Sequence, residues 1–252
     1  MLNNSISNFS PISLDYLSKI KITERVDTKF VIPVGKLAQI LNEINDDYSI
    51  LQIEGKRELE YHTAYFDTPD FKFYMNHHNG ILERFKIRMR TYKNSNQSFL
   101  ELKRKTNRGK IIKHRKSIDE INDLTDENIN YLNTLVSLNS NKLIRSVENS
   151  FNRITLLSHN KNERVTLDYN LKFMLNDNVK SLSFISVIEV KNINNNSYST
   201  ITEVLKKMRI YPTAFSKYCM AMAYLHPNLK QNSFKINKLA LKKIEYDTTI
   251  NN

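Results

Sequence analysis

Charged side chains, most of them basic, recur at every second position in three short stretches: RVDTKF at 25–30, KIRMR at 86–90 and LELKRK at 100–105. In a β-strand alternate residues point to opposite faces, so each stretch would present one charged face and one largely apolar face. The charged positions are Arg25, Asp27 and Lys29; Lys86, Arg88 and Arg90; and Glu101, Lys103 and Lys105. Guanidinium and ammonium groups gathered in this way are suited to bind phosphate oxygens. The three stretches therefore predict a phosphate-binding surface.

The second half of the sequence adds basic residues with a few carboxylates between them. On predicted strands or at a predicted helix start, these residues are Arg153, Arg164, Asp168, Glu189, Lys191 and Lys217. Carboxylates beside phosphate-binding cations can hold a divalent metal that bridges the same phosphates. A single basic strand is more often a solvated face, and a single strand glutamate is more often an ion-pair partner. Only the combination favours phosphate chemistry.

The composition is that of a chain that can fold and that should attract anions. It has 252 residues, 40% of them hydrophobic, and a formal net charge of +12, which favours nucleic acid, polyphosphate, nucleotides or a membrane surface as partners. Cys219 is the only cysteine, which excludes an intrachain disulfide and a zinc site built on several thiolates. The sequence has no phosphate-binding glycine loop, dinucleotide fingerprint, zinc-ligand spacing or nucleophile elbow.

Hydrophobic periodicity and turn signals predict an α+β fold. Strands are expected at about 23–32, 58–66, 82–93, 97–106, 110–118, 150–158, 163–169 and 182–192. Helices are expected after Pro33, after Thr125, from Thr200 with Glu203 in a capping box, and over 213–225. Short polar links between the strands of 82–118 favour antiparallel hairpins. A sheet with charge on its inner face should close into a barrel with a polar lumen, which also removes exposed edges.

We divide the chain into a lead-in over 1–20 with a short helix at 13–20, one body over 21–226, and a polar tail over 227–252. The tail is rich in lysine, and we expect it to be loosely ordered. No apolar run approaches the roughly 18 residues that a membrane-spanning helix requires. The first residues also lack the layout of a signal peptide. We therefore expect a cytoplasmic protein.

The order of these motifs resembles that of the VTC domain, a branch of the triphosphate tunnel metalloenzyme (CYTH-like) superfamily. The stretches that carry the resemblance are RVDTKFVIP, YFDTPDFKFY, FKIRMRTY, FLELKRKT, HRKSI, FNRITL, ERVTLDYNLKF, FISVIEVK and PTAFSKYCMAM, between about residues 23 and 225. Each stretch is weak alone, whereas the ordered set is specific.

The resemblance implies a tunnel of eight antiparallel strands that binds ATP and polyphosphate. It also implies transfer of the ATP γ-phosphate to a polyphosphate chain, with Mn²⁺ or Mg²⁺ as cofactor. Carried over by motif, the phosphate ligands are Lys29, Arg88, Arg90, Lys103, Lys116, Arg153, Arg164 and Lys217. The expected catalytic residues are Arg88, Arg90, Lys103 and Glu189, with Glu189 the main metal ligand and Glu101 a second one. The position of Lys116 stays open, because Lys113 or Arg115 could face inward instead.

Many members of the superfamily begin with ExExK, whereas this chain has Arg25, Asp27 and Lys29 at the corresponding positions. The missing glutamate puts in doubt a hydrolase that relies on several acidic metal ligands, and it agrees with the VTC branch. Three alternatives stay open: a triphosphatase that uses the same tunnel, a polyphosphate sensor without turnover, and a nucleic-acid binder, for which the net charge is the only argument. No SPX-like region precedes the motifs and no membrane segment follows, so we expect the protein to act alone or with a membrane-protein partner.

Overall fold

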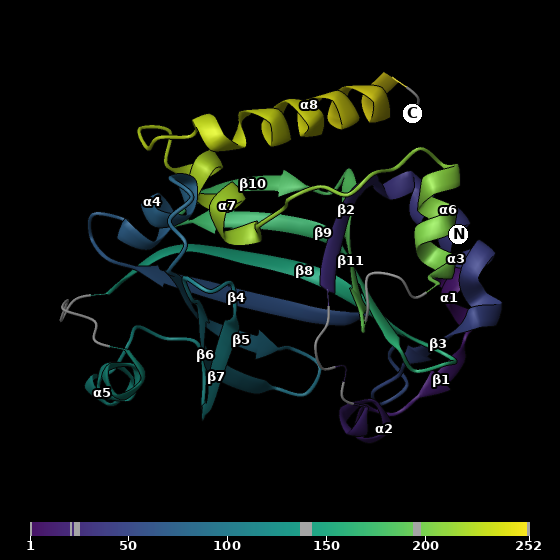
Figure 1. Cartoon of the computed structure of the whole chain (residues 1–252), viewed down its shortest axis with the longest axis horizontal. Helices are drawn as coiled ribbons and strands as arrows, with labels where there is room; N and C mark the ends of the chain where they lie inside the picture. The colour runs from purple at the N-terminus through teal and green to yellow at the C-terminus, as the bar shows by residue number, and fades with distance from the viewer. Residues whose placement is uncertain (1, 21, 23–25, 137–142, 194–197, 251–252) are drawn as a thin grey trace.

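The computed structural model describes residues 2–20, 22, 26–136, 143–193 and 198–250, and its strands form one sheet (Figure 1). Among these residues, eight strands follow one another in the order β2-β11-β9-β8-β4-β5-β6-β7, and every pairing along this path is antiparallel. This confirms the predicted α+β class with about eight antiparallel strands. The bounds are β2 (Val26–Pro33), β4 (Leu59–Asp67), β5 (Arg84–Tyr92), β6 (Gln97–Lys105), β7 (Ile111–Ile118), β8 (Ile144–Ser158), β9 (Glu163–Leu175) and β11 (Ile185–Asn192).

Short strands extend the sheet beside this path. Strand β1 pairs in parallel with β3, and β3 pairs in antiparallel with β8. Strand β10 pairs in antiparallel with β9, which it follows in the sequence. The bounds are β1 (Ser10–Ile12), β3 (Tyr48–Leu51) and β10 (Asn178–Leu182).

Hydrogen bonding does not close the sheet in the part of the chain that the structure describes. The strands β2 and β7 are the two ends of the path, and no pairing joins them. The end strand β7 carries Lys113, His114, Arg115 and Lys116 in succession. Charged side chains on an edge strand discourage further pairing. The strands of the expected barrel are therefore present in order, but the sheet is open between β2 and β7.

Helices pack on the apolar, outer face of the sheet. The cluster beneath α3 and α6 includes Phe30, Leu167 and Ile188, and the cluster beneath α5 includes Ile87 and Leu100. These residues alternate along their strands with the charged positions, so burial of one face against the helices turns the charged face inward. The helix bounds are α1 (Leu2–Ser7), α2 (Leu14–Lys19), α3 (Leu37–Ile44), α4 (Lys72–His78), α5 (Asp126–Leu135), α6 (Thr200–Lys207), α7 (Lys217–Leu225) and α8 (Lys235–Ile250).

Helix α7 packs on the inner face instead. Its residues Tyr218 and Met222 are buried in a cluster with Val147, Phe173 and Val187. The helix begins at Ser216, whose hydroxyl accepts a hydrogen bond from the amide of Cys219. In this way α7 fills one end of the inner face with apolar side chains and leaves the charged positions beyond it uncovered.

The helices of the structure can be compared with the predicted helix in the lead-in, the predicted capping box and the predicted loose tail. The short helix of the lead-in is confirmed as α2, which Ser13 caps. The expected capping box at Thr200 is wrong, because Ser199 is the N-cap of α6 and accepts from the amide of Thr202 at 3.2 Å. The expected loose tail is also wrong, because α8 forms there and buries Leu241 in the same cluster as α7. Arg25, expected on the first strand, lies outside the described residues.

None of the described helices combines the length and the apolar character that crossing a membrane requires.

Candidate functional site

The register of β5, β6 and β7 arranges charged side chains in rows across the inner face. Lys86 lies opposite Lys103, which lies opposite Lys113. The next row, two residues further along each strand, is Arg88, Glu101 and Arg115. Neighbouring positions in a row lie about 5 Å apart in backbone terms. Regular pairing of three basic strands therefore concentrates positive charge in a small area.

The lysine row contains no carboxylate. The ammonium of Lys86 donates to the Ser216 hydroxyl at the start of α7, with an N–O distance of 2.8 Å. Within the described residues Lys103 forms no hydrogen bond or ion pair, and the charge of Glu189 acts to raise its pKa. Burial, together with the charges of Lys86 and Lys113, lowers the pKa of Lys103 to about 8. Like charges placed side by side repel one another, so a bound anion would stabilise this row.

The second row contains a carboxylate, Glu101, between its two arginines. Glu101 Oε2 accepts from Arg88 Nε at 2.6 Å, and Glu101 Oε1 accepts from Arg115 Nη2 at 2.6 Å. Burial alone would raise the pKa of Glu101, but Arg88 and Arg90 outweigh it and lower the pKa to about 2. Glu101 is thus an ionised carboxylate between two guanidinium groups. The row still carries one net positive charge.

Arg90 is a buried guanidinium that forms no direct ion pair among the described residues, although it lies within the electrostatic influence of Glu101. Its side chain is 7% exposed, and its Nε donates to the Thr63 hydroxyl at 3.1 Å. The guanidinium lies 5.6 Å from the ring centroid of Tyr61 and 5.9 Å from that of Phe151. Burial and the charge of Arg88 lower its pKa. A neutral hydroxyl and two ring faces only partly replace water around a buried cation, which again favours an anionic ligand.

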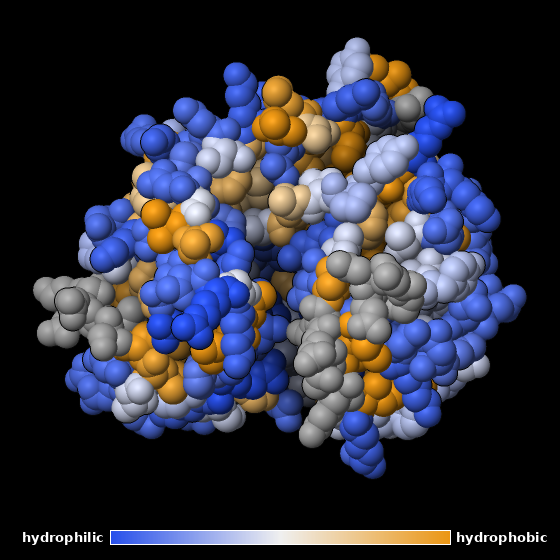
Figure 2. All heavy atoms as spheres, in the orientation of Figure 1, coloured by the Kyte–Doolittle hydropathy of each residue, from blue (hydrophilic) through white to orange (hydrophobic). Residues whose placement is uncertain are grey.

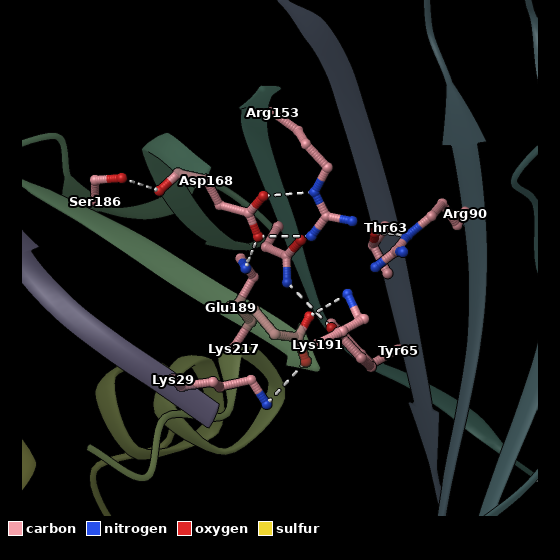
Figure 3. A network of polar contacts seen from close by, with 11 residues as sticks. Lys29, Thr63, Tyr65, Arg90, Arg153, Asp168, Ser186, Glu189, Lys191 and Lys217 are labelled. Atoms are coloured by element: carbon pink, nitrogen blue, oxygen red, sulfur yellow. Dashed lines mark hydrogen bonds and ion pairs between the residues drawn. The ribbon is translucent and has the colours of Figure 1, made fainter. Parts of the chain in front are cut away.

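On the opposite side, Asp168 of β9 holds two cations (Figure 3). Arg153 Nε donates to Asp168 Oδ1 at 2.5 Å and Arg153 Nη2 donates to Asp168 Oδ2 at 2.7 Å, while the ammonium of Lys217 contacts the same carboxylate. Asp168 is 3% exposed. Burial opposes its ionisation, but Arg153 and Lys217 outweigh burial and hold the pKa of Asp168 well below its usual range. The carboxylate therefore orients one strand residue and one helix residue at once.

Glu189 of β11 lies between two lysines in the same network (Figure 3). Its Oε1 is 3.5 Å from the ammonium of Lys29, and its Oε2 is 2.9 Å from that of Lys191. Burial would raise the pKa of Glu189, yet the charges of Lys191 and Lys29 outweigh it and keep the pKa well below the usual value. The structure thus brings Lys29, Glu189, Arg153 and Lys217 onto one wall.

Two of the expected phosphate ligands have other partners in the structure. Lys116 is on the outer face of β7, where its ammonium donates to Glu127 of α5 at 2.5 Å. The prediction that Lys116 faces inward is therefore wrong. The β7 residues that share the face of Lys103 and Glu101 are Lys113 and Arg115. Arg164 is on the inner face, but its Nη2 donates to the backbone carbonyls of Leu17 and Ile20 at 2.9 and 3.2 Å. It joins β9 to the end of α2.

The model of the VTC domain family matches residues 24–226, a range that contains both walls just described. The chain belongs to the VTC domain family. No curated protein matches the chain significantly.

Solved structures similar to this VTC domain include three proteins described as candidate adenylyl or adenylate cyclases. The Vibrio parahaemolyticus protein is 10% identical, with a TM-score of 0.48 over 79% of this chain and 97% of its own. The Hippeastrum protein, described as having a dominant triphosphatase activity, is 15% identical, with a TM-score of 0.48 over 79% and 95%. The Bacillus halodurans protein is 12% identical, with a TM-score of 0.47 over 77% and 96%.

The space-filling view shows where the charged walls meet solvent. This face of the VTC domain is hollowed between the part formed by β5, β6 and β7 and the part formed by β2 and β11 (Figures 1 and 2). Hydrophilic side chains border the hollow (Figure 2). A linear anion could therefore reach the inner face along the opening between the two walls.

Lys86, Lys113, Arg115 and Lys191 belong to this face but were not among the expected ligands. The sequence does indicate Lys86 and Lys191, because each lies two residues from an expected ligand and so shares its face of the strand. Lys86 is two residues before Arg88, and Lys191 is two residues after Glu189. Asp168 was recognised as an inward carboxylate, but its contact with Lys217 joins residues 49 positions apart. Alternation along a strand does not predict a contact of that kind.

Proposed function

We propose that this VTC domain binds the triphosphate of ATP and the end of a polyphosphate chain on its inner face, and transfers the γ-phosphate from one to the other. The observation that carries the proposal is the concentration of positive charge: the lysine row of Lys86, Lys103 and Lys113 contains no carboxylate, and Arg90 is buried with a hydroxyl as its hydrogen-bond acceptor. Phosphate oxygens would form charge-assisted hydrogen bonds with these groups. Transfer between phosphates needs positioning and charge neutralisation rather than a strong base.

The two walls would have different tasks in this reaction. Arg90 and Lys103 would neutralise the transferred phosphoryl group, because neither forms an ion pair with a carboxylate in the described part of the chain. Arg153, fixed by two hydrogen bonds to Asp168, would hold a neighbouring phosphate through its remaining donors. Arg88 would assist Arg90 from the adjacent row, while Lys29 and Lys217 would bind phosphates on the opposite wall. Fixed donors cost little reorganisation when charge shifts during transfer.

A divalent metal fits this face only as a shared ligand of protein and substrate. No group of three or more His, Cys, Asp or Glu side chains that could hold a metal occurs in the described ranges. Glu189 would be the protein ligand, because its carboxylate is ionised and faces the cationic walls. Glu101 is the weaker candidate, because both of its oxygens accept short hydrogen bonds from guanidinium groups, whereas one oxygen of Glu189 is 3.5 Å from the nearest lysine ammonium. Mg²⁺ in phosphoryl-transfer sites is held by one or two carboxylates together with phosphate oxygens, and it would neutralise phosphate charge.

The test is incubation of the purified protein with ATP and Mn²⁺ or Mg²⁺, followed by a polyphosphate gel and a free-phosphate assay. Long chains are expected, and Glu189→Ala or Arg90→Ala should lower their yield on the order of 100-fold. Lys116→Ala is the matched control, because it removes a lysine from the outer face of the same sheet. Full activity of Arg90→Ala would contradict the proposed arrangement.

The same products, together with a tripolyphosphate-binding assay, separate the other uses of this face. Free phosphate without chains would identify a triphosphatase. Binding of tripolyphosphate with neither product would identify a sensor, and its displacement by RNA or DNA would indicate a nucleic-acid binder.

A further inference from the structure

Helix α8 lies outside the range that matches the VTC domain family and is nevertheless fixed to the body. Its inner side buries Leu241 in the cluster that contains α7. Lys238 of the same side donates to Gln231 at 2.7 Å, and Glu245 is 3.3 Å from the ammonium of Lys180 on β10. Figure 1 shows α8 as the outermost element beside α7 and β10. The helix therefore presents its outer side in a fixed orientation.

The outer side of α8 is apolar along its length. Ile236 is 81% exposed, Leu239 55%, Tyr246 66% and Ile250 63%. At about 100° per residue, these four side chains fall within an arc of roughly 80°. Figure 2 shows apolar side chains along this helix at the surface. Single exposed apolar residues are common, whereas an aligned set on one helix indicates an interaction surface. We call these four residues the outer stripe.

Three lysines of α8 lie within or beside the outer stripe. Lys243 projects within its arc, and Lys235 and Lys242 follow along one border, while Asp247 stands at the other border. All three lysines are exposed. A helix with an apolar stripe and adjacent lysines has the two features that bind the interface of an anionic bilayer: apolar side chains that enter the acyl boundary and ammonium groups that reach the phosphates. A lysine within the stripe is compatible with this position, because its long stem lets the ammonium return to the headgroups.

We propose that α8 docks the protein on the surface of an anionic lipid bilayer, with the outer stripe in the interface and Lys235, Lys242 and Lys243 at the lipid phosphates. The net charge of +12 acts in the same direction, because it attracts the whole molecule to a negative surface. The proposal does not depend on the phosphoryl-transfer activity, since α8 contains none of the inner-face residues.

A second copy of the chain is a less suitable occupant. A stripe on a helix of 16 residues is about 24 Å long and about 10 Å wide, so it offers roughly 240 Å². A stable interface needs about 800 Å² from each partner. Packing two such stripes against each other would also bring together the lysines of two chains that each carry a net charge of +12, and these lysines would repel one another. Lipid phosphates compensate the same lysines.

The experiment is co-sedimentation of the full chain with vesicles of phosphatidylcholine, with and without phosphatidylglycerol. Tripolyphosphate is present in excess throughout, so that the inner face does not bind lipid headgroups. Leu239→Ser with Tyr246→Ser removes half of the outer stripe, and Lys242→Gln with Lys243→Gln removes two charges. Leu82→Ser is the matched control, because Leu82 is 59% exposed on the link between α4 and β5. Far-UV circular dichroism and the melting temperature establish that each variant is folded.

The wild-type chain should bind the vesicles that contain phosphatidylglycerol and should be released by salt. Each neutralised lysine should weaken binding about fivefold, the stripe variant should lose binding by about tenfold or more, and the control should bind like the wild type. Absence of binding, or equal binding by the folded stripe variant, would overturn the proposal. Concentration-dependent dimerisation that the stripe variant abolishes, without vesicle binding, would assign the surface to a second copy instead.

Discussion

The ring of Phe151 stacks on the ring of Tyr61, with centroids 5.2 Å apart and planes inclined by 8°. Two guanidinium groups share this pair: Arg90 lies 5.6 and 5.9 Å from the two centroids, and Arg153 lies 5.0 and 5.3 Å from them. The negative faces of aromatic rings attract cations. The ring pair therefore allows two like charges to lie near each other on the inner face, from where both can reach the same anion.

Loss of one ring should weaken phosphate binding. Tyr61→Leu removes a face that both guanidinium groups use, so we expect the affinity for tripolyphosphate to fall about two- to thirtyfold, the range of a single cation–π contact. Tyr61→Phe keeps the ring and should bind nearly like the wild type. Isothermal titration calorimetry measures both, and the melting temperature shows that they are folded. Equal affinity of the leucine and phenylalanine variants would contradict this role of the rings.

The lowered pKa of Lys103 predicts a binding profile with a defined sign. The pKa is about 8 in the folded chain, so the ammonium loses its proton as the pH rises through this value. Tripolyphosphate binding should then weaken between pH 7 and 9, and Lys103→Arg should move this decline to higher pH because a guanidinium stays charged. Fluorescence or calorimetric titrations at constant ionic strength measure the profile. A profile that Lys103→Arg leaves unchanged would assign the decline to another group.

The same pKa predicts the opposite trend for stability without ligand. In the unfolded chain Lys103 has the ordinary lysine pKa of 10.5, whereas in the folded chain it releases its proton near 8. Between these values the unfolded state binds more protons, so the free energy of unfolding should rise with pH. Lys103→Met should lack this contribution. Urea unfolding of both chains at pH 7.5 and 9.5 gives the comparison, and a wild-type contribution that falls with pH relative to Lys103→Met would contradict the prediction.

The sequence could predict most of the charged inner face, because the period of two is regular in β5 and β6. Arg88, Arg90 and Lys103 lie where alternation places them. The same rule failed at Lys116, because β7 has Lys113, His114, Arg115 and Lys116 in succession, and a run of polar residues does not indicate which set faces inward. The strand register against Glu101 decides it.

Tertiary contacts explain the other differences. Arg164 has the predicted face, but its guanidinium binds two carbonyls at the end of α2, a segment about 145 residues earlier in the chain. Helix α8 was taken for a loose tail because its composition is polar overall. Leu241 of this helix is buried in the cluster around α7. Composition and periodicity do not include such long-range packing.

Replacement of Asp168 should separate stability from binding. In Asp168→Asn, the buried charges of Arg153 and Lys217 lose their shared carboxylate, which we expect to cost about 3 kcal/mol or more of unfolding free energy. Tripolyphosphate can replace that charge, so it should raise the melting temperature of the variant more than that of the wild type. Differential scanning fluorimetry with and without tripolyphosphate tests this. An equal ligand-induced shift in both chains would indicate that phosphate does not reach Arg153 and Lys217.

Acid should act on the same carboxylate in a predictable window. The folded-state pKa of Asp168 is held well below the value near 4 that it has in the unfolded chain. Its contribution to stability is therefore complete above about pH 4 and is lost as the pH falls towards the folded-state pKa. The wild type should lose stability relative to Asp168→Asn over this acidic range. Urea midpoints between pH 6 and 3 measure the difference, and parallel curves would contradict it.

The two faces of β7 provide a matched pair of lysines. Lys113 lies opposite Lys103 on the inner face, whereas Lys116 contacts Glu127 and the ring of Tyr131 in α5. Lys113→Met should weaken tripolyphosphate binding several-fold and reduce its salt dependence, because one cation near the phosphates is lost. Lys116→Met should leave binding unchanged and should alter stability by no more than about 1 kcal/mol, since exposed ion pairs contribute little. If the two variants bind equally, the inner face of β7 does not contact the anion, and the phosphate site is confined to β5, β6 and the opposite wall.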